Sequence, residues 1–416
     1  MIDQRKDSSH LAGMNSSGTI SQRRLFLKHV AQTSPFPPML EVKKAEGCII
    51  TDVNDKTFLD FISGISVSNI GHRHPKVIEA IHKQADAYMH VMVYGEFIQG
   101  PQVKLAQLLS HVLPQGINSV YFVTSGAEAI EGALKLAKRH TGRTELISFQ
   151  NAYHGSSHGA LSIMGAETFK QAYRPLLPDT RQIRFNNFDD LALITTRTAC
   201  VVVEPVQGEA GALKAKTEWL QALRNRCNET NCMLIFDEIQ TGYGRTGKFF
   251  AYQHFGVMPD IICMAKGMGG GLPIGAFAAS NTLMNDLSHD PLLGHITTFG
   301  GNALCCASAV AVTEVLMETD LIEQVEAKSA YIVQQLQHSD IIEIRGLGFL
   351  LAMRFESNDR VLRIMNRCYE LGLITDWFLF ADNCLRLAPP LIISYEEIDQ
   401  ACAILLQAIQ DTQSAK

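Results

Sequence analysis

Short apolar runs alternate with amphipathic stretches between about residue 76 and residue 280. The apolar runs are hydrophobic at almost every position, which predicts strands buried on both faces. They lie at 119–123, 145–149, 199–205, 232–238 and 260–265. Between them, apolar residues recur at helical spacing, as in the stretch 130–137. Strands of this kind are typical of a parallel sheet covered by helices, so we predict an α/β, doubly wound domain.

The pattern changes after about residue 305, where longer helices are followed by short strands at 341–346, 349–355 and 384–390 and a last helix from Tyr395. This order predicts a second, smaller α+β domain. The segment 21–75 contains two short strands around an Asn-Asp turn and is expected to join that domain. The predicted division is a disordered N-terminus (1–20), an N-terminal part of the small domain (21–75), a large domain (76–305) and a C-terminal small domain (306–416).

Composition narrows the class of protein. The chain has 416 residues, 46% of them hydrophobic, and a net charge of −6. The positive charges form no stripe that could neutralise phosphates, and no apolar run approaches the roughly 18 residues of a membrane span. We expect a soluble protein that binds neither nucleic acid nor membrane. The ten cysteines are scattered without a C-x-x-C pair, which favours reduced thiols in a cytoplasmic protein.

Two chemically active residues follow neighbouring predicted strands. Asp237 ends the run 232–238, and Lys266 follows the run 260–265. Ligands of an open parallel sheet bind at the carboxyl ends of the strands, so both side chains are expected to face one crevice. Taken singly, each residue is more often a helix cap or a solvated lysine. Together, an amine and a carboxylate are two parts of a pyridoxal phosphate site.

A phosphate cradle is the third part. The segment 124–129, Thr-Ser-Gly-Ala-Glu-Ala, lies between a predicted strand and a predicted helix, so backbone N–H groups at the helix start would face an anion. A second phosphate-binding candidate is the segment 297–302. No metal site is expected.

The chain resembles the class III aminotransferases, the ornithine and 4-aminobutyrate type of fold type I pyridoxal-phosphate enzymes. The resemblance extends from about residue 25 to the C-terminus and rests on seven motifs in the order of the family. They are GHRHP at 71–75, SGAEA at 125–129, AYHG at 152–155, EPVQGEAG at 204–211, FDEIQTGYGRTG at 236–247, AKGMGGGLPIGA at 265–276 and TTFGGNAL at 297–304. The Asp237-to-Lys266 spacing also matches the family.

The resemblance implies a role for each matching residue. Lys266 would be the Schiff-base lysine and proton shuttle, and Asp237 would keep the pyridine nitrogen protonated. Gln240 would bond near the ring oxygen, and Tyr153 would stack on the ring. Thr298 would reach the phosphate in the neighbouring subunit, which implies a homodimer with shared active sites. The cofactor-binding set is Ser125, Gly126, Ala127, Tyr153, Glu204, Asp237, Gln240, Lys266 and Thr298. His154 is interpreted as a residue that fills a gap.

The resemblance implies less about how the substrate is bound than about the cofactor. In the ornithine-type branch an arginine pairs with a glutamate while an amine substrate is bound, and is released to bind the α-carboxylate of an oxo acid. Arg386 and Glu209 match this pair, although an interdomain salt bridge is the alternative. Ser156 stands where ornithine, acetylornithine and 4-aminobutyrate members usually carry a further arginine, and Arg73 is the candidate replacement.

The predicted activity is transfer of an amino group from an amino acid or ω-amine to an oxo acid, 2-oxoglutarate or pyruvate, by a ping-pong mechanism. Three alternatives stay open. One is an aminomutase of the glutamate-1-semialdehyde type on the same fold. Another is a serine hydrolase that uses Ser157, because the segment 155–159 fits G-x-S-x-G. The third is a silent binding protein, against which the presence of both Lys266 and Asp237 argues.

Overall fold

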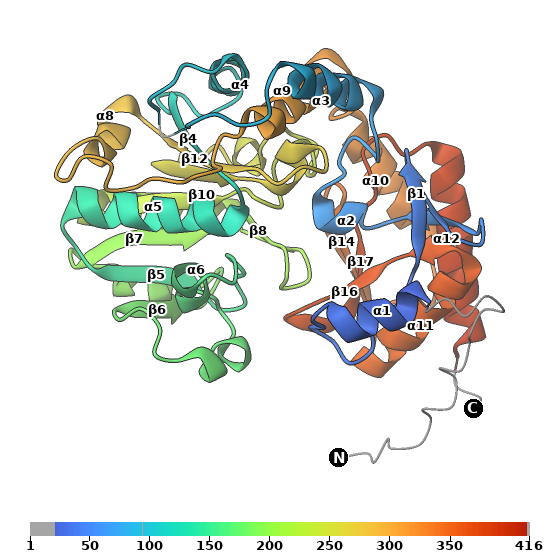
Figure 1. Cartoon of the computed structure of the whole chain (residues 1–416). Helices are drawn as coiled ribbons and strands as arrows, with labels where there is room; N and C mark the ends of the chain where they lie inside the picture. The colour runs from blue at the N-terminus through green and yellow to red at the C-terminus, as the bar shows by residue number, and fades with distance from the viewer. Residues whose placement is uncertain (1–20, 94, 414–416) are drawn as a thin grey trace.

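The computed structural model describes residues 21–93 and 95–413. Figure 1 shows a central sheet flanked by helices on one side of the molecule and smaller sheets with the last helices on the other. The central sheet has seven strands in the order β4-β12-β11-β10-β7-β5-β6. Their bounds are Ser119–Val123, Gly275–Ala279, Ile261–Met264, Met233–Asp237, Thr198–Val203, Glu145–Phe149 and Thr180–Ile183.

The five predicted strands of this sheet are confirmed, and two more were missed. Strand β6 lies at the edge, pairs only with β5 and has the polar sequence TRQI. Strand β12 is antiparallel to both of its neighbours, β11 and β4, whereas the pairs β5–β6, β5–β7, β7–β10 and β10–β11 are parallel. The sheet is therefore mostly parallel, as predicted, with one strand reversed.

Helices cover both faces of the sheet. Alternate residues of β7 belong to two different core clusters, Val201 and Val203 to one, Cys200 and Val202 to the other. Helix α5 (Gly126–Thr141) covers one face, and α7 (Thr217–Thr230) covers the other. Helix α9 (Ala303–Glu318) packs on α3 (Pro75–Ala87) and α4 (Gly100–Ser110). This arrangement confirms the doubly wound α/β class.

Outside this part, the described residues form two four-stranded sheets and three long helices. One sheet contains β1 (Val42–Glu46), β2 (Ile49–Asp52), β3 (Thr57–Asp60) and β15 (Leu373–Ile374). The other contains β13 (Glu343–Leu347), β14 (Leu350–Arg354), β17 (Ala381–Leu387) and β16 (Asp376–Phe378). The helices are α10 (Gln324–Gln335), α11 (Asn358–Leu371) and α12 (Tyr395–Asp411). Because β3 pairs with β15, the segment before residue 75 shares a sheet with the C-terminal part.

Short elements complete the described part: α1 (Gln22–His29), α2 (Ser63–Ser66), α6 (His158–Ser162), α8 (Asn281–Met284), β8 (Val206–Gln207) and β9 (Leu213–Lys214). The predicted disordered segment 1–20 lies outside the described residues. The domain boundaries at 75 and 305 stay predictions, and α9 begins just before the second of them. Among the described helices, none combines the length and the apolar character needed to cross a bilayer.

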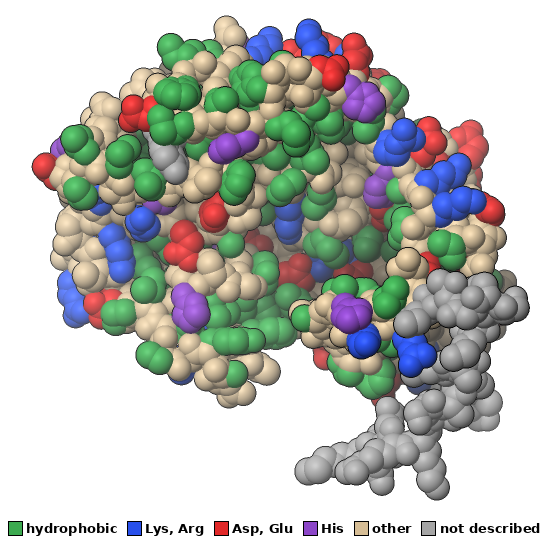
Figure 2. All heavy atoms as spheres, in the orientation of Figure 1, with side chains coloured by type: hydrophobic (Ala, Val, Ile, Leu, Met, Phe, Trp, Pro, Cys, Tyr) green, Lys and Arg blue, Asp and Glu red, His purple; other side chains and the backbone are tan. Residues whose placement is uncertain are grey.

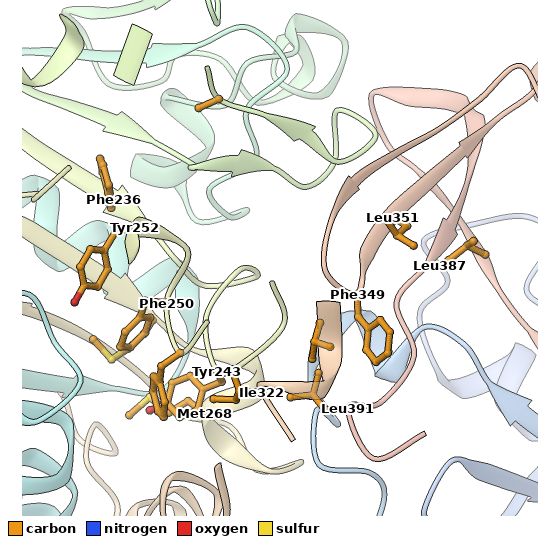
Figure 3. Packing of buried hydrophobic residues seen from close by; sticks show 14 of the residues in the cluster. Phe236, Tyr243, Phe250, Tyr252, Met268, Ile322, Phe349, Leu351, Leu387 and Leu391 are labelled. Atoms are coloured by element: carbon orange, nitrogen blue, oxygen red, sulfur yellow. The ribbon is translucent and has the colours of Figure 1, made fainter. Parts of the chain in front are cut away.

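One core cluster continues from the large sheet into the C-terminal part. Figure 3 shows Tyr243 and Met268 next to Ile322 and Leu391. The fully buried Arg245 also joins the two parts, since its guanidinium donates to the carbonyls of Phe349 and Pro389 and to Asn69 Oδ1. The two parts therefore meet across a continuous, well-packed boundary, and the candidate site lies beside it.

Candidate active site at the carboxyl ends of the sheet

A cavity of about 480 Å³ opens where β4, β10 and β11 end. Its size suits a small-molecule cofactor with part of a substrate. Its wall carries Ser125, Gly126, Ala127, Tyr153, His154, Gly155, Ser156, Glu204, Glu209, Asp237, Ile239, Gln240, Lys266 and several apolar residues. In Figure 2 this face is hollowed between the two parts of the molecule, and both acidic and basic side chains are visible in the hollow.

The start of α5 forms one end of the cavity. Ser125 is the N-cap, and its Oγ accepts a hydrogen bond from Glu128 N at 3.2 Å. The N–H groups of Gly126 and Ala127 belong to the first turn, where no intrahelical acceptor exists. A side chain at Gly126 would have its Cβ only 2.9 Å from Ile239, so glycine allows the close packing there. The sequence-predicted cradle therefore lies on the cavity wall and suits an anion.

Asp237 is held by two donors. Its Oδ1 accepts from Ile239 N at 3.0 Å, and its Oδ2 is 2.7 Å from His154 Nδ1. Burial alone would lower the pKa of His154, but the hydrogen bond to Asp237 and the charges of Asp237 and Glu204 outweigh it and raise the pKa. His154 Nε2 is buried and has no hydrogen-bond partner among the described residues. The interpretation of His154 as a gap filler is wrong, because it is the partner of Asp237.

Glu204 fixes the backbone around the site. Its carboxylate accepts from Tyr153 N and Gly208 N, both at 2.9 Å. Burial raises the pKa of Glu204 to about 7, although the charge of His154 opposes this rise. Gly208 in turn makes room for Gln240, since a Cβ at residue 208 would lie 1.6 Å from Gln240 Oε1. Gln240 Nε2 is buried without a partner in the described part of the chain, so one amide donor is available at the wall.

Lys266 lies two residues after the end of β11, on the wall of the cavity. Its φ is 47°, a left-handed conformation that is rare for a residue with a side chain. Strain of this kind clusters at functional sites. Burial lowers the pKa of Lys266, although nearby Glu209 opposes the shift. A lowered pKa keeps a larger fraction of the amine neutral at a given pH, which a nucleophile or base requires.

Arg386 and Glu209 form a buried ion pair. Arg386 NH2 lies 2.9 Å from Glu209 Oε1 and 2.8 Å from Oε2, and the guanidinium is 4.4 Å from the centre of the Phe378 ring. Glu209 Oε2 also accepts from Leu379 N at 3.1 Å. Arg386 Nε and NH1 have no partner among the described residues. Glu209 lines the cavity and Arg386 does not, so the carboxylate separates the arginine from the cavity.

Two sequence-predicted residues lie elsewhere in the same chain. Thr298 is exposed and borders a separate pocket with Glu128, Glu131 and His295. Arg73 is exposed and borders a surface pocket beside α3, so it does not replace the arginine missing at Ser156 within one chain.

The geometry does not support a serine nucleophile at Ser157. Its Oγ donates to Glu131 Oε1 at 2.5 Å, and Ser157 occupies the N-cap position of α6 without a side-chain cap bond. A nucleophilic serine needs a base within reach that can take its proton, usually an imidazole, and then return it. Ser157 is absent from the residues that line the cavity at Lys266.

The residues on the wall fit pyridoxal 5′-phosphate. The first turn of α5 offers N–H donors to a phosphate, Asp237 offers a carboxylate to a protonated ring nitrogen, and Lys266 offers an amine to an aldehyde. The unpartnered Gln240 Nε2 is a donor for a ring oxygen. Tyr153, half-buried on the same wall, provides an aromatic face.

Comparisons with known proteins agree with this fit. The family model "Aminotransferase class-III" matches residues 30–409. An acetylornithine aminotransferase of Clostridium acetobutylicum is 37% identical over 380 residues, which cover 88% of this chain and 95% of the relative. The structure of an ornithine aminotransferase from Toxoplasma gondii superposes with a TM-score of 0.86 at 29% identity and covers 93% of this chain and 94% of that one.

A third similar protein is an amine transaminase from an uncultivated Pseudomonas species, solved in its PLP-bound form. Its TM-score is 0.85 at 25% identity, and the match covers 92% of this chain and 100% of that one. The resemblance inferred from seven motifs is confirmed by these findings. The chain belongs to the class III aminotransferases, enzymes that use pyridoxal 5′-phosphate to move an amino group from a donor to an oxo acid.

Proposed function

We propose that the cavity beside Lys266 is the active site, in which an ω-amine or amino acid donor and then 2-oxoglutarate or pyruvate react in turn. The observation that carries this proposal is the convergence of Lys266, Asp237 and the first turn of α5 on one cavity wall. When bound there, pyridoxal phosphate supplies an electron sink for the electrons of the donor C–H bond that breaks.

Each residue of the cavity wall would have its own role in the reaction. Lys266 Nζ would hold the cofactor, accept the proton of the donor carbon and return it on the other side of the transfer. Asp237 would keep a proton on the ring nitrogen, with His154 orienting its carboxylate. Gly126 and Ala127 would bind the phosphate through their N–H groups, next to Ser125. Gln240 would donate to the ring oxygen, Tyr153 would cover the ring, and Glu204 would hold the Tyr153 backbone.

The Arg386–Glu209 pair would serve the two substrates in turn. An amine donor needs no cation, so the pair stays closed and the buried arginine stays neutralised. An oxo acid brings an α-carboxylate that can replace Glu209 as the partner of Arg386, whose Nε and NH1 are still without acceptors.

Arg386→Lys tests this role. Lysine keeps the charge but cannot form a bidentate pair, so kcat/KM for the oxo acid is expected to fall by about 10–100-fold, while the half-reaction of a simple ω-amine changes much less. Each half-reaction can be followed separately by the absorbance of the cofactor. Equal losses in both half-reactions would show that the pair is only structural.

The identity of the donor is tested with a panel of amines and a fixed acceptor. Relatives named acetylornithine or ornithine aminotransferase make acetylornithine and ornithine the first donors to try. Ser156 at the cavity makes ω-amines without a second carboxylate the next class. Turnover that depends on added 2-oxoglutarate or pyruvate supports transfer. Conversion of one amino aldehyde without any acceptor would support an aminomutase instead.

We propose further that two copies of the chain share their active sites in a cytoplasmic homodimer. Thr298 is exposed in one chain, and apolar side chains are exposed around it, among them Phe299, Ile296 and Leu292. Figure 2 shows that hydrophobic side chains are frequent on this face of the molecule. Exposed apolar surface of this kind marks association sites. The ten cysteines, all unpaired and nine of them buried, suit a reducing compartment.

Mixing two variants with lesions at different residues tests the shared site. In a heterodimer of a Lys266→Ala chain and a Thr298→Ala chain, one site carries both lesions and the other carries neither. The heterodimer is expected to reach about half the wild-type activity per dimer, because one of its two sites is intact. Subunits must first be shown to exchange, by mass spectrometry of the intact dimer. Exchange without recovery above either parent would contradict the shared site.

A further inference from the structure

Glu131 lies one turn after Ala127 on α5, and its carboxylate accepts hydrogen bonds from a segment outside the helix. A single oxygen, Oε1, accepts from Ser157 Oγ at 2.5 Å, Gly159 N at 2.8 Å and Ala160 N at 3.1 Å. The last two donors belong to the first turn of α6, where N–H groups lack intrahelical acceptors. A carboxylate that receives three hydrogen bonds is a strong local anchor.

The anchored segment is also a wall of the active site. Residues 153–156 line the cavity directly before Ser157. This wall carries His154, which bonds to Asp237, and Tyr153, which also lines the cavity. The hydroxyls of Tyr153 and Ser156 are 3.3 Å apart. A displacement of the anchor would therefore move three side chains of the wall together.

Close packing against side chains of α5 leaves the segment little freedom. Gly155 has a φ of 127°, and a Cβ there would lie 2.8 Å from Ala127 Cβ. A Cβ at Gly159 would lie 2.0 Å from Glu131 Oε2. Ala127 and Glu131 are four residues apart, so they occupy the same face of the helix. The segment thus rests on α5 at two successive turns, the first of which is the proposed phosphate site.

We propose that Glu131 is a positioning residue for the aminotransferase reaction. It fixes the segment 153–160 on α5 and so sets the distance between the cavity wall formed by residues 153–156 and the phosphate cradle at the first turn of α5. This role rests on the proposed active site. Glu131 itself is not among the residues that line the cavity at Lys266, so it acts through Tyr153, His154 and Ser156.

The test compares four variants of the full-length protein. Glu131→Ala removes the acceptor, and Glu131→Gln keeps an amide oxygen that can accept from the same donors, although without the charge. Ser157→Ala removes one donor. Arg139→Ala, on the same helix, is the control. Two readouts are taken: hydrogen exchange of the segment 153–162 in the protein without cofactor, and kcat and KM of the loaded enzyme.

Glu131→Ala is expected to speed exchange in this segment at least tenfold and to lower kcat/KM about 10²-fold, the effect of misplacing reacting groups by about 1 Å. For Glu131→Gln, both values should lie within a few-fold of wild type. Ser157→Ala should lie between Glu131→Ala and the wild type in both values, and Arg139→Ala should match the wild type. Unchanged exchange in Glu131→Ala would overturn the proposal. Faster exchange with normal kcat/KM would also overturn it, because the anchor would then be merely structural.

The comparison of Glu131→Gln with Glu131→Ala distinguishes the negative charge from the hydrogen-bonded anchor. If Glu131→Gln had nearly wild-type exchange but were as inactive as Glu131→Ala, the negative charge and not the anchor would matter, and the proposal would fail. The exchange measurement needs neither substrate nor cofactor. A failure of the proposed function, such as full activity in Lys266→Ala, would therefore leave the exchange result readable on its own.

Discussion

Lys266→Ala is expected to lower amino transfer by at least about 10⁴-fold, the upper range for loss of a general acid–base group. Alanine removes both the amine that holds the cofactor and the group that moves the proton. No other lysine lines the cavity among the described residues, so no neighbour can substitute. Measurement of kcat for each half-reaction with purified enzyme checks the size of the loss.

Two further observations make the Lys266 result specific. Borohydride treatment of the wild type should attach the cofactor to the peptide that contains residue 266, as mass spectrometry can show. A small primary amine added to Lys266→Ala should restore part of the proton transfer, because it can enter the cavity. Lys170→Ala is the control, since Lys170 is also buried but bonds to Gln182 on β6. Full activity in Lys266→Ala would contradict the assignment of the site.

Asp237→Asn is expected to lower kcat about 10³-fold, the effect of removing one charge-stabilising group from a preorganised site. Asparagine keeps the shape and can still accept from Ile239 N, but it cannot hold a proton on the ring nitrogen. The affinity for pyridoxal phosphate should change far less than kcat. A loss confined to cofactor affinity would make Asp237 only a binding residue.

The same variant should change the titration of His154. Because the bond and the charge of Asp237 raise the pKa of His154 against its burial, their removal should lower that pKa, and the imidazole should lose its proton at a lower pH. NMR of the labelled histidines can follow this shift. Glu238→Gln is the matched control, since it neutralises the next residue, whose carboxylate accepts from Ala251 N and Tyr252 N instead.

The sequence predicted those parts of the fold that have a strong local signal. Strands β5, β7 and β10 are buried on both faces, so their apolar runs stand out. Strand β6 lies at an edge and contains Thr180, Arg181 and Gln182, which gives no apolar run. Strand β12 consists of Gly, Ala and Phe and follows a glycine-rich loop, so its local sequence does not resemble a strand.

The candidate site was predictable where a motif marks it, and not where a contact joins distant segments. Lys266 and Asp237 follow apolar strands, and the topology of a parallel sheet brings them together. The bond between His154 and Asp237 joins residues 83 positions apart, and no spacing rule predicts such a pair. Glu131 looks like any polar residue of an amphipathic helix until the segment that it holds is known.

Because β12 runs antiparallel to β11, the connection between them, which carries Lys266, has a fixed length. This stretch, residues 265–274, leaves the sheet at β11 and returns at Gly275, where a Cβ would lie 2.4 Å from the Ser125 carbonyl. Both ends of this stretch continue into paired strands of the sheet, so an inserted or deleted residue cannot be absorbed by sliding either strand. Enzyme engineering on this scaffold can therefore vary side chains such as Leu272 and Ile274, but it should leave the length of the stretch untouched.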